Sequence, residues 1–188
     1  MAKKLYEESG IQAIADAIRE KNGLTETYTV SEMAAAVLAL SGGSAAQVIF
    51  PPADGWSAHQ IFYYGSHSLG TCSFDNGVFT GSAVSNQGAG MISTLTDLSG
   101  VNTVRIEFTA SGTIDGYYGQ VCAYVNGDRL NSGDNRVVEK VASAAEISAG
   151  IMDIDVSSLS GSYYIIAGVD VWSSGKSASC TISKIRLE

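Results

Sequence analysis

Two carboxylates on one predicted strand face are the first candidates for chemistry in this 188-residue chain. Asp153 and Asp155 alternate with Ile154 and Val156, which predicts a strand with both carboxylates on its polar face, roughly 7 Å apart between Cα atoms. That separation suits a general acid/base pair for glycoside cleavage, or a cation site completed by a loop carbonyl. A solvated strand face explains the same pattern, and we favour that interpretation.

The remaining patterns for enzymes and metal sites are incomplete. His59 and His67 are eight residues apart in a loop-rich stretch, so as metal ligands they would need partners from elsewhere in the chain. Gly175-Lys176-Ser177 lacks the first glycine of a phosphate-binding loop, and no nucleophile elbow or H-E-x-x-H motif occurs. We therefore predict no enzymatic activity.

One loop is both acidic and rich in glycine, from Asn126 to Asn135. Its carboxylate and carbonyl oxygens could hold a structural Ca²⁺ ion, although the loop lacks the EF-hand pattern and a plain hairpin loop accounts for it. We predict no cofactor, with structural Ca²⁺ as the alternative.

Aromatic residues form a more informative set. Several lie near predicted strand ends or loops, where a ring face can stack on a pyranose: Trp56, Tyr63, Tyr64, Tyr117, Tyr118 and Trp172. Neighbours in a strand face opposite ways, so one tyrosine of each pair must face the core, and Trp172 could cover the core end. The predicted glycan-binding residues are Trp56, Tyr63, Tyr64 and Trp172.

These candidates must be positioned by strands. Residues 104–108 alternate between apolar and polar side chains, which predicts a half-buried strand, whereas Tyr163 to Trp172 is apolar on both faces and predicts a central one. Asn76-Gly77 predicts a hairpin turn. In the last strand the apolar side chains stand at even positions up to Ile182 and at odd positions from Ile185, which predicts a bulge at Ser183-Lys184.

About ten such strands follow residue 44, with no helical segment long enough for parallel crossovers. We predict a mainly β protein: residues 44–188 form an antiparallel jelly-roll-like β-sandwich.

Residues 1–43 differ in character and predict an α-helical hairpin over residues 5–40. The first helix ends at Asn22-Gly23, and the second begins with a capping box formed by Thr29 and Glu32. Two helices of this length need a packing partner. The apolar stripes therefore predict an assembly interface: Ile11, Ile14, Ile18, Met33, Val37 and Leu40.

The same segment resembles a helical module of tail-fibre and virion-associated proteins of phages and prophages of Gram-positive bacteria. The matching residues are Ile14-Ala15-Asp16-Ala17-Ile18-Arg19-Glu20-Lys21, Gly23, Thr25, Tyr28-Thr29 and Glu32-Met33-Ala34. Asn22 stands where that family usually has Thr, and Val30 where it often has Pro. The resemblance covers about 30 residues and implies a virion structural context.

Composition narrows the class of partner. The net charge of −8 repels phosphate backbones, which excludes general nucleic-acid binding. No apolar stretch is long enough to span a membrane, and the N-terminus lacks the apolar region of a secretory signal. Cys72, Cys122 and Cys180 lie in strand-like runs and are interpreted as small buried hydrophobes of a protein made in a reducing cytoplasm.

Together these features predict a virion structural protein made in the cytoplasm of the bacterial host. The hairpin anchors it to other virion proteins or to symmetry mates, with a homotrimer favoured, and the sandwich is displayed for attachment to a host cell-wall polysaccharide, as in a tail fibre or receptor-binding protein. Three alternatives remain: a passive decoration protein of the head or tail, a glycan-cleaving enzyme, and a bacterial surface adhesin, for which a signal peptide and wall anchor would be expected.

Overall fold

The computed structural model of the chain describes residues 15–16, 46–61, 68–129 and 136–188. The chain divides into two compact units, residues 1–45 and 46–188. In the first unit Ala15 and Asp16 are helical, with Ala15 buried and Asp16 exposed. The rest of the predicted hairpin lies outside the described residues, as do its interface positions Ile11, Ile14, Ile18, Met33, Val37 and Leu40.

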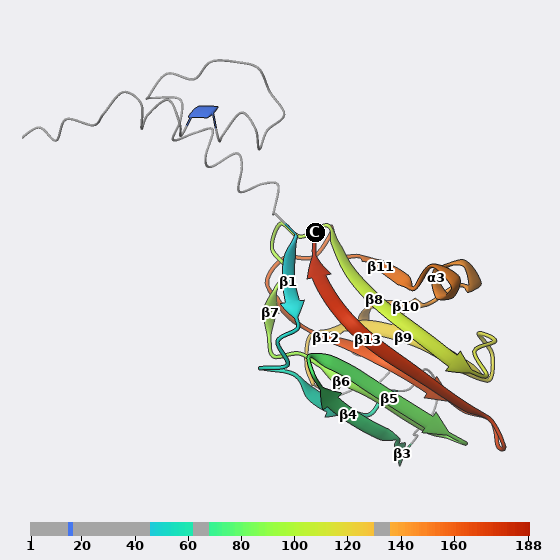
Figure 1. The fold of residues 1–188 in the computed structure, drawn as a ribbon. Helices are drawn as coiled ribbons and strands as arrows, with labels where there is room; N and C mark the ends of the chain where they lie inside the picture. The colour runs from blue at the N-terminus through green and yellow to red at the C-terminus, as the bar shows by residue number, and fades with distance from the viewer. Residues whose placement is uncertain (1–14, 17–45, 62–67, 130–135) are drawn as a thin grey trace, which may run out of the picture. The chain divides into compact units, whose positions relative to one another are not determined.

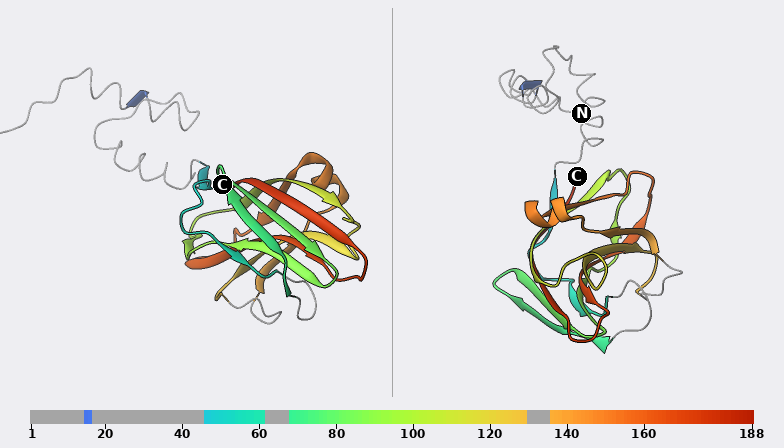
Figure 2. Two further views of the ribbon diagram at one scale, coloured as in Figure 1. Left: turned by 60° about the horizontal axis from the view of Figure 1, so that its bottom comes forward. Right: turned by 90° about the vertical axis from the view of Figure 1, so that its right-hand side faces the viewer.

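Residues 46–188 form two mainly antiparallel sheets packed face to face (Figures 1 and 2). The order in the first sheet, sheet A, is β11 (Ile151–Asp155), β8 (Thr103–Gly112), β13 (Ser177–Leu187), β5 (Val78–Val84) and β4 (Thr71–Asp75). Beside the C-terminal part of β13 lies β1 (Gln47–Phe50). The prediction of a mainly β sandwich is confirmed.

The second sheet, sheet B, has the order β10 (Arg136–Val141), β9 (Gly119–Asn126), β12 (Ser162–Val171), β6 (Gln87–Ile92) and β2 (Ser57–His59). Two short strands join its margins: β3 (Ser68–Leu69) runs parallel to β6, and β7 (Thr96–Asp97) pairs with the start of β12. The central position predicted for Tyr163 to Trp172 is confirmed, because β12 lies between β9 and β6.

The main core lies between the sheets and follows the alternation of the sequence. Val104, Ile106 and Phe108 of β8 are buried there, opposite Val121 and Val125 of β9. Burial of apolar side chains on both inner faces is the principal force that holds the sheets together.

A second, smaller core lies on the other face of sheet B. Its buried members are Ile61, Ile92, Cys122, Tyr124 and Ile166. Ile61 crosses directly over β6, where Gly88 and Gly90 have no side chains; a Cβ at Gly88 would lie 1.4 Å from the Ile61 carbonyl oxygen. Consequently all eight residues of β9 are buried, on both of its faces.

Two local sequence predictions are confirmed. Asn76 and Gly77, with φ of 53° and 74°, join β4 to β5 in a tight hairpin, as positive φ at both central positions requires. The register of β13 against β8 shifts between Ile182 and Lys184, at the predicted bulge.

A short helix that the sequence analysis did not predict, α3 (Ala144–Ala149), connects β10 to β11. The Ser143 hydroxyl accepts a hydrogen bond from the Glu146 backbone N–H, and the Glu146 carboxylate accepts one from the Ser143 N–H. Ser143-x-x-Glu146 is a capping box, so this signal was present in the sequence.

The three cysteines are free thiols, and their surroundings match the prediction of structural residues. Cys122 and Cys180 are buried and Cys72 is half-buried. Burial raises the pKa of the Cys180 thiol to about 12, so the thiol is neutral at physiological pH. Within the part of the chain that the structure describes, no helix is long and apolar enough to cross a membrane.

Candidate functional site

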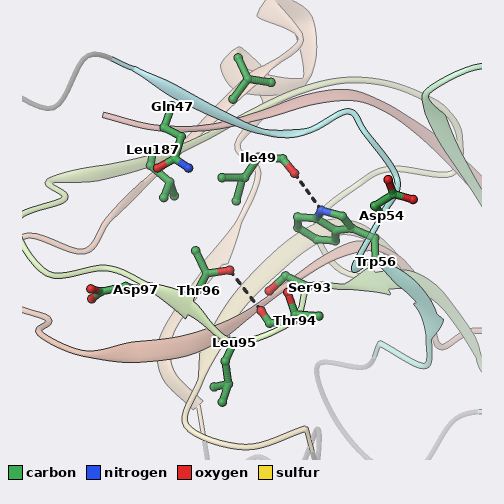
Figure 3. Close-up of a pocket in the computed structure, with 11 residues that line it drawn as sticks. Gln47, Ile49, Asp54, Trp56, Ser93, Thr94, Leu95, Thr96, Asp97 and Leu187 are labelled. Atoms are coloured by element: carbon green, nitrogen blue, oxygen red, sulfur yellow. Dashed lines mark hydrogen bonds between the residues drawn. The ribbon is translucent and has the colours of Figure 1, made fainter.

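Trp56 is held in one orientation at the end of the turn that follows β1. Its backbone N–H donates to the Ala53 carbonyl at 2.9 Å, and its indole Nε1–H donates to the Ile49 carbonyl at 3.0 Å (Figure 3). The Phe50 ring meets the indole edge to face, with centroids 5.7 Å apart. These contacts fix the ring before any ligand is present.

Beside this ring lies a cavity of about 410 Å³, here called the Trp56 pocket. In Figure 3 the indole lies between Ile49 on one side and Ser93 and Thr94 on the other. The volume falls within the range of small-molecule sites, about 300–1,000 Å³. The described lining residues are Gln47, Val48, Ile49, Asp54, Trp56, Ser93, Thr94, Leu95, Thr96, Asp97 and Leu187.

Hydrogen-bonding groups dominate the wall opposite the indole. Thr96 Oγ1 donates to the Thr94 carbonyl at 3.1 Å, and Ser93 Oγ accepts from the Ile165 N–H at 2.9 Å. Asp97 accepts from the Ser99 N–H at 3.0 Å, and this hydrogen bond lowers the pKa of the Asp97 carboxyl. The described lining contains the carboxylates of Asp54 and Asp97 and no lysine or arginine, so this pocket disfavours an anionic ligand.

The other predicted tryptophan is at the opposite end of the sandwich. The start of β12 pairs with β7 beside the Trp56 pocket, whereas Trp172 directly follows the end of β12. A ten-residue strand spans roughly 30 Å. The structure therefore separates Trp56 from Trp172, and Tyr63 and Tyr64 lie outside the described residues.

Trp172 belongs to a group of three aromatic rings, here called the Trp172 cluster. The Tyr117 ring lies 4.6 Å from that of Tyr118 and 5.4 Å from that of Trp172, between centroids. The sequence placed Tyr117 and Tyr118 near a predicted strand end or loop. Their contact with Trp172 could not be predicted, because it depends on the arrangement of the strands.

The two candidate catalytic carboxylates are each bound by a neighbouring residue. Asp153 accepts two hydrogen bonds from Arg105, at 2.7 and 2.8 Å, and Asp155 accepts from the N–H and hydroxyl of Ser157, at 3.0 and 2.7 Å. These hydrogen bonds lower the pKa of both carboxyls. A glycosidase needs one carboxyl whose pKa is raised, so this pair offers no general acid.

Candidate metal ligands are likewise not gathered. Among the residues that the structure describes, no group of three or more His, Cys, Asp and Glu is placed to hold an ion. His59 lies in β2, and burial followed by the charge of Arg129 lowers its pKa. His67 and residues 130–135 of the loop considered for Ca²⁺ fall outside the described ranges.

A second cavity, of about 570 Å³, lies between α3 and sheet A. Its described lining combines side chains of α3 with the edge of β8 and the bulge of β13, including Ile147, Glu107, Thr109 and Ser183. Glu107 is paired with Arg186 at 2.9 Å and Lys184 at 3.6 Å, so its charge is compensated. No candidate residue from the sequence lies in this cavity.

No family model and no curated protein matches the chain. Among solved structures, the carbohydrate recognition domain of Emp47p is similar with a TM-score of 0.43, 11% identity, and coverage of 71% of this chain and 88% of that one. The K1 cleaved adhesin domain of Lys-gingipain from Porphyromonas gingivalis W83 is similar with a TM-score of 0.35 and 12% identity, and the match covers 77% of this chain and 90% of that one. A family two carbohydrate esterase from Cellvibrio japonicus is similar with a TM-score of 0.32 and 10% identity, and the match covers 71% of this chain and 35% of that one. At these TM-scores, neither ligand nor activity carries over from these proteins to this chain.

Proposed function

We propose that this chain is a virion structural protein of a bacteriophage whose β-sandwich binds a host-surface carbohydrate in the Trp56 pocket. The observation that carries the carbohydrate part is the pocket itself, in which a fixed indole lies opposite hydroxyl groups. The resemblance of residues 14–34 to the phage helical module supports the virion part.

Sugars present an apolar face of C–H groups and a rim of hydroxyls, and the Trp56 pocket offers a partner for each. The indole supplies apolar area at little entropic cost, because its orientation is already set by Ile49 and Phe50. Around it stand side chains that donate or accept hydrogen bonds: Gln47, Asp54, Ser93, Thr94, Thr96 and Asp97. These polar groups can fix the orientation of a sugar whose apolar face lies on the indole.

Charge narrows the ligand further. Asp54 and Asp97 repel carboxylated or phosphorylated sugars, whereas they accept hydrogen bonds from neutral sugar hydroxyls. The preferred ligand is therefore a neutral saccharide of the bacterial cell wall.

The test is calorimetric titration of the full chain with neutral wall oligosaccharides from a panel of Gram-positive bacteria. We expect saturable heat with at least one of them, and about tenfold weaker binding for Trp56→Phe, because the smaller ring loses stacking area. Thr96→Val, which keeps side-chain shape and removes a hydroxyl, weakens binding about fivefold. Thr80→Val, on β5 of sheet A and away from the Trp56 pocket and the Trp172 cluster, is the matched control for Thr96→Val and binds like the wild type.

Thermal unfolding of each variant verifies that the sandwich is intact. Absence of binding across the panel would contradict the carbohydrate proposal and favour passive decoration of the particle. Equal affinities for Trp56→Phe, Thr96→Val and the wild type would place the sugar elsewhere and overturn the assignment of this pocket.

The virion proposal has its own test. We expect the chain to be found by mass spectrometry in purified particles, and a version lacking residues 1–43 to be absent from them. Light scattering of the full chain at tens of micromolar tests the favoured homotrimer, and a monomeric mass would contradict self-assembly. Absence of the full chain from particles would overturn the virion role without affecting the carbohydrate proposal.

A further inference from the structure

The Trp172 cluster presents two exposed tyrosine rings beside the half-buried ring of Trp172. Tyr117 is 60% exposed and Tyr118 is 42% exposed. Within the described part of the sandwich, neither tyrosine nor Trp172 belongs to either buried core cluster. Contiguous exposed rings on a soluble protein mark an interaction surface, since leaving them in water forgoes the stabilisation of burial.

Hydrogen bonds hold the turn that carries these rings. Asp115 Oδ1 accepts from the backbone N–H groups of Tyr117, Tyr118 and Gly119, at 2.9, 2.7 and 3.3 Å. Trp172 is tied to the same turn, because its backbone N–H donates to the Tyr118 carbonyl at 3.1 Å and its indole N–H donates to the Tyr117 carbonyl. The rings are therefore arranged before a ligand arrives, which lowers the entropic cost of binding.

A positive charge lies next to this aromatic surface. The Lys176 ammonium is 6.0 Å from the centroid of the Tyr118 ring. Lys176 is exposed and forms no ion pair with any residue that the structure describes. Asp115, the carboxylate of this turn, accepts three N–H groups on its Oδ1 and forms no ion pair with Lys176. Lys176 is thus available to an anionic group on a ligand that stacks on the rings.

The size of the surface favours a small occupant. The turn that follows Trp172 consists of Ser173, Ser174 and Gly175, which add no apolar area to the rings. A stable protein–protein contact needs about 800 Å² on each partner, more than three adjoining rings provide. A sugar needs only one or two ring faces.

We propose that the Trp172 cluster is a second saccharide-binding site, distinct from the Trp56 pocket, that takes a sugar unit bearing a carboxylate or phosphate. The sugar stacks on Tyr117 and Trp172, and its anionic group pairs with Lys176. The two sites differ in charge, since carboxylates line the first and an ammonium flanks the second. The second site stands on its own observations and does not depend on the first.

The experiment titrates the full chain with three probes: galacturonate, its methyl ester, and galactose 6-phosphate. The ester keeps the sugar and removes the charge, so it isolates the contribution of Lys176. We expect at least one anionic probe to bind at least about fivefold more tightly than the ester, with a difference that shrinks as salt is added. The comparison of the two anionic probes distinguishes a carboxylate from a phosphate.

Variants locate the binding. Lys176→Met keeps the apolar stem and should bring the affinity for the anionic probe down to that for the ester, whereas Tyr117→Ala should weaken every probe about tenfold. Lys184→Met removes an equal charge from sheet A and serves as the control, with unchanged affinity. All probes are also titrated against Trp56→Phe, in which the neutral-sugar pocket is weakened, and the preference for the anionic probe over the ester should persist there.

Three results would overturn the proposal: no saturable binding of either anionic probe, equal binding of anionic probe and ester, or unchanged affinities in Lys176→Met and Tyr117→Ala. Because the comparison of anionic probe and ester is repeated in Trp56→Phe, these results do not depend on binding of the ester to the Trp56 pocket.

Discussion

Arg105 on β8 donates two hydrogen bonds to Asp153 on the neighbouring strand β11, and its Nη1 lies 2.9 Å from Glu188. The sequence pattern placed Asp153 correctly on a polar strand face but did not identify its partner, which is 48 residues away. Because Arg105 holds the pKa of Asp153 low, this carboxylate is ionised and structural.

This ion pair predicts a pH dependence of stability. A folded-state pKa below the unfolded value, about 3.9 for Asp, means that the stabilisation is present above the unfolded pKa and is lost as the pH falls through the folded-state pKa. The Asp153 side chain is 45% exposed, so solvent screening limits the pair to about 0.2–1 kcal/mol. We predict that Asp153→Asn lowers the free energy of unfolding by this amount at neutral pH and that the difference disappears in acid.

Urea unfolding over a pH series measures this difference. Ser73→Ala, a change without a titratable group at an exposed position on β4 of the same sheet, is the control and should show no such convergence. A difference between Asp153→Asn and the wild type that is constant with pH would contradict the interpretation.

The close approach of Ile61 to Gly88 on β6 leads to a second prediction about a single residue. Its missing side chain lets Ile61 cross the strand, and a Cβ there would overlap the Ile61 carbonyl oxygen at 1.4 Å. We predict that Gly88→Ala destabilises the sandwich by about 1–3 kcal/mol or more, because the backbone has to shift to make room for the Cβ. Gly127→Ala, where a Cβ meets nothing within 4 Å, should be nearly neutral in chemical denaturation.

Among the elements, α3 depends strongly on its cap, because none of its residues is fully buried and only Ile147 packs against the main core. Besides the capping box, Lys140 pairs with Glu146 at 2.9 Å and links the helix to β10. We predict that Ser143→Ala costs about 1 kcal/mol of stability, measured by denaturant unfolding. Ser148→Ala, an exposed change within the same helix, removes no cap and should cost less than half as much.

For the whole sandwich, the role of β1 decides where a folded fragment can begin. β1 pairs with β13, Phe50 is fully buried, and its ring contacts those of Trp56 and Phe74. We predict that residues 46–188 unfold cooperatively as an isolated fragment. A fragment of residues 51–188 should lose about 3–5 kcal/mol or more, since it lacks the Phe50 ring.

Calorimetry of the two fragments tests this expectation. Equal unfolding temperatures for 46–188 and 51–188 would show that β1 contributes nothing to the core. Failure of 46–188 to fold would show instead that residues 1–45 are needed for the sandwich.

Local pattern was sufficient for much of the strand content. The alternation of Val104, Ile106 and Phe108, the Asn76-Gly77 turn and the parity change near Ser183 each predicted a feature that the structure contains. These signals work because side chains of a strand alternate with a period of two, and because tight turns need residues that tolerate positive φ. The capping box of α3 was equally local and was overlooked.

Contacts between residues that are far apart in the sequence were decided by the tertiary structure alone. The Trp56 pocket needs β1 beside β13 and β7 beside β12, pairings that bring residues 47–56, 93–97 and 187 together. The pairing of β9 with β12 places Trp172 with Tyr117 at the far end of β12, so two tryptophans grouped as one candidate set belong to two surfaces. Sequence by itself determined which residues could face the core and which could face a sugar. Only the packed sheets decided which of them meet, because strand order and register are set by contacts between residues far apart in the chain.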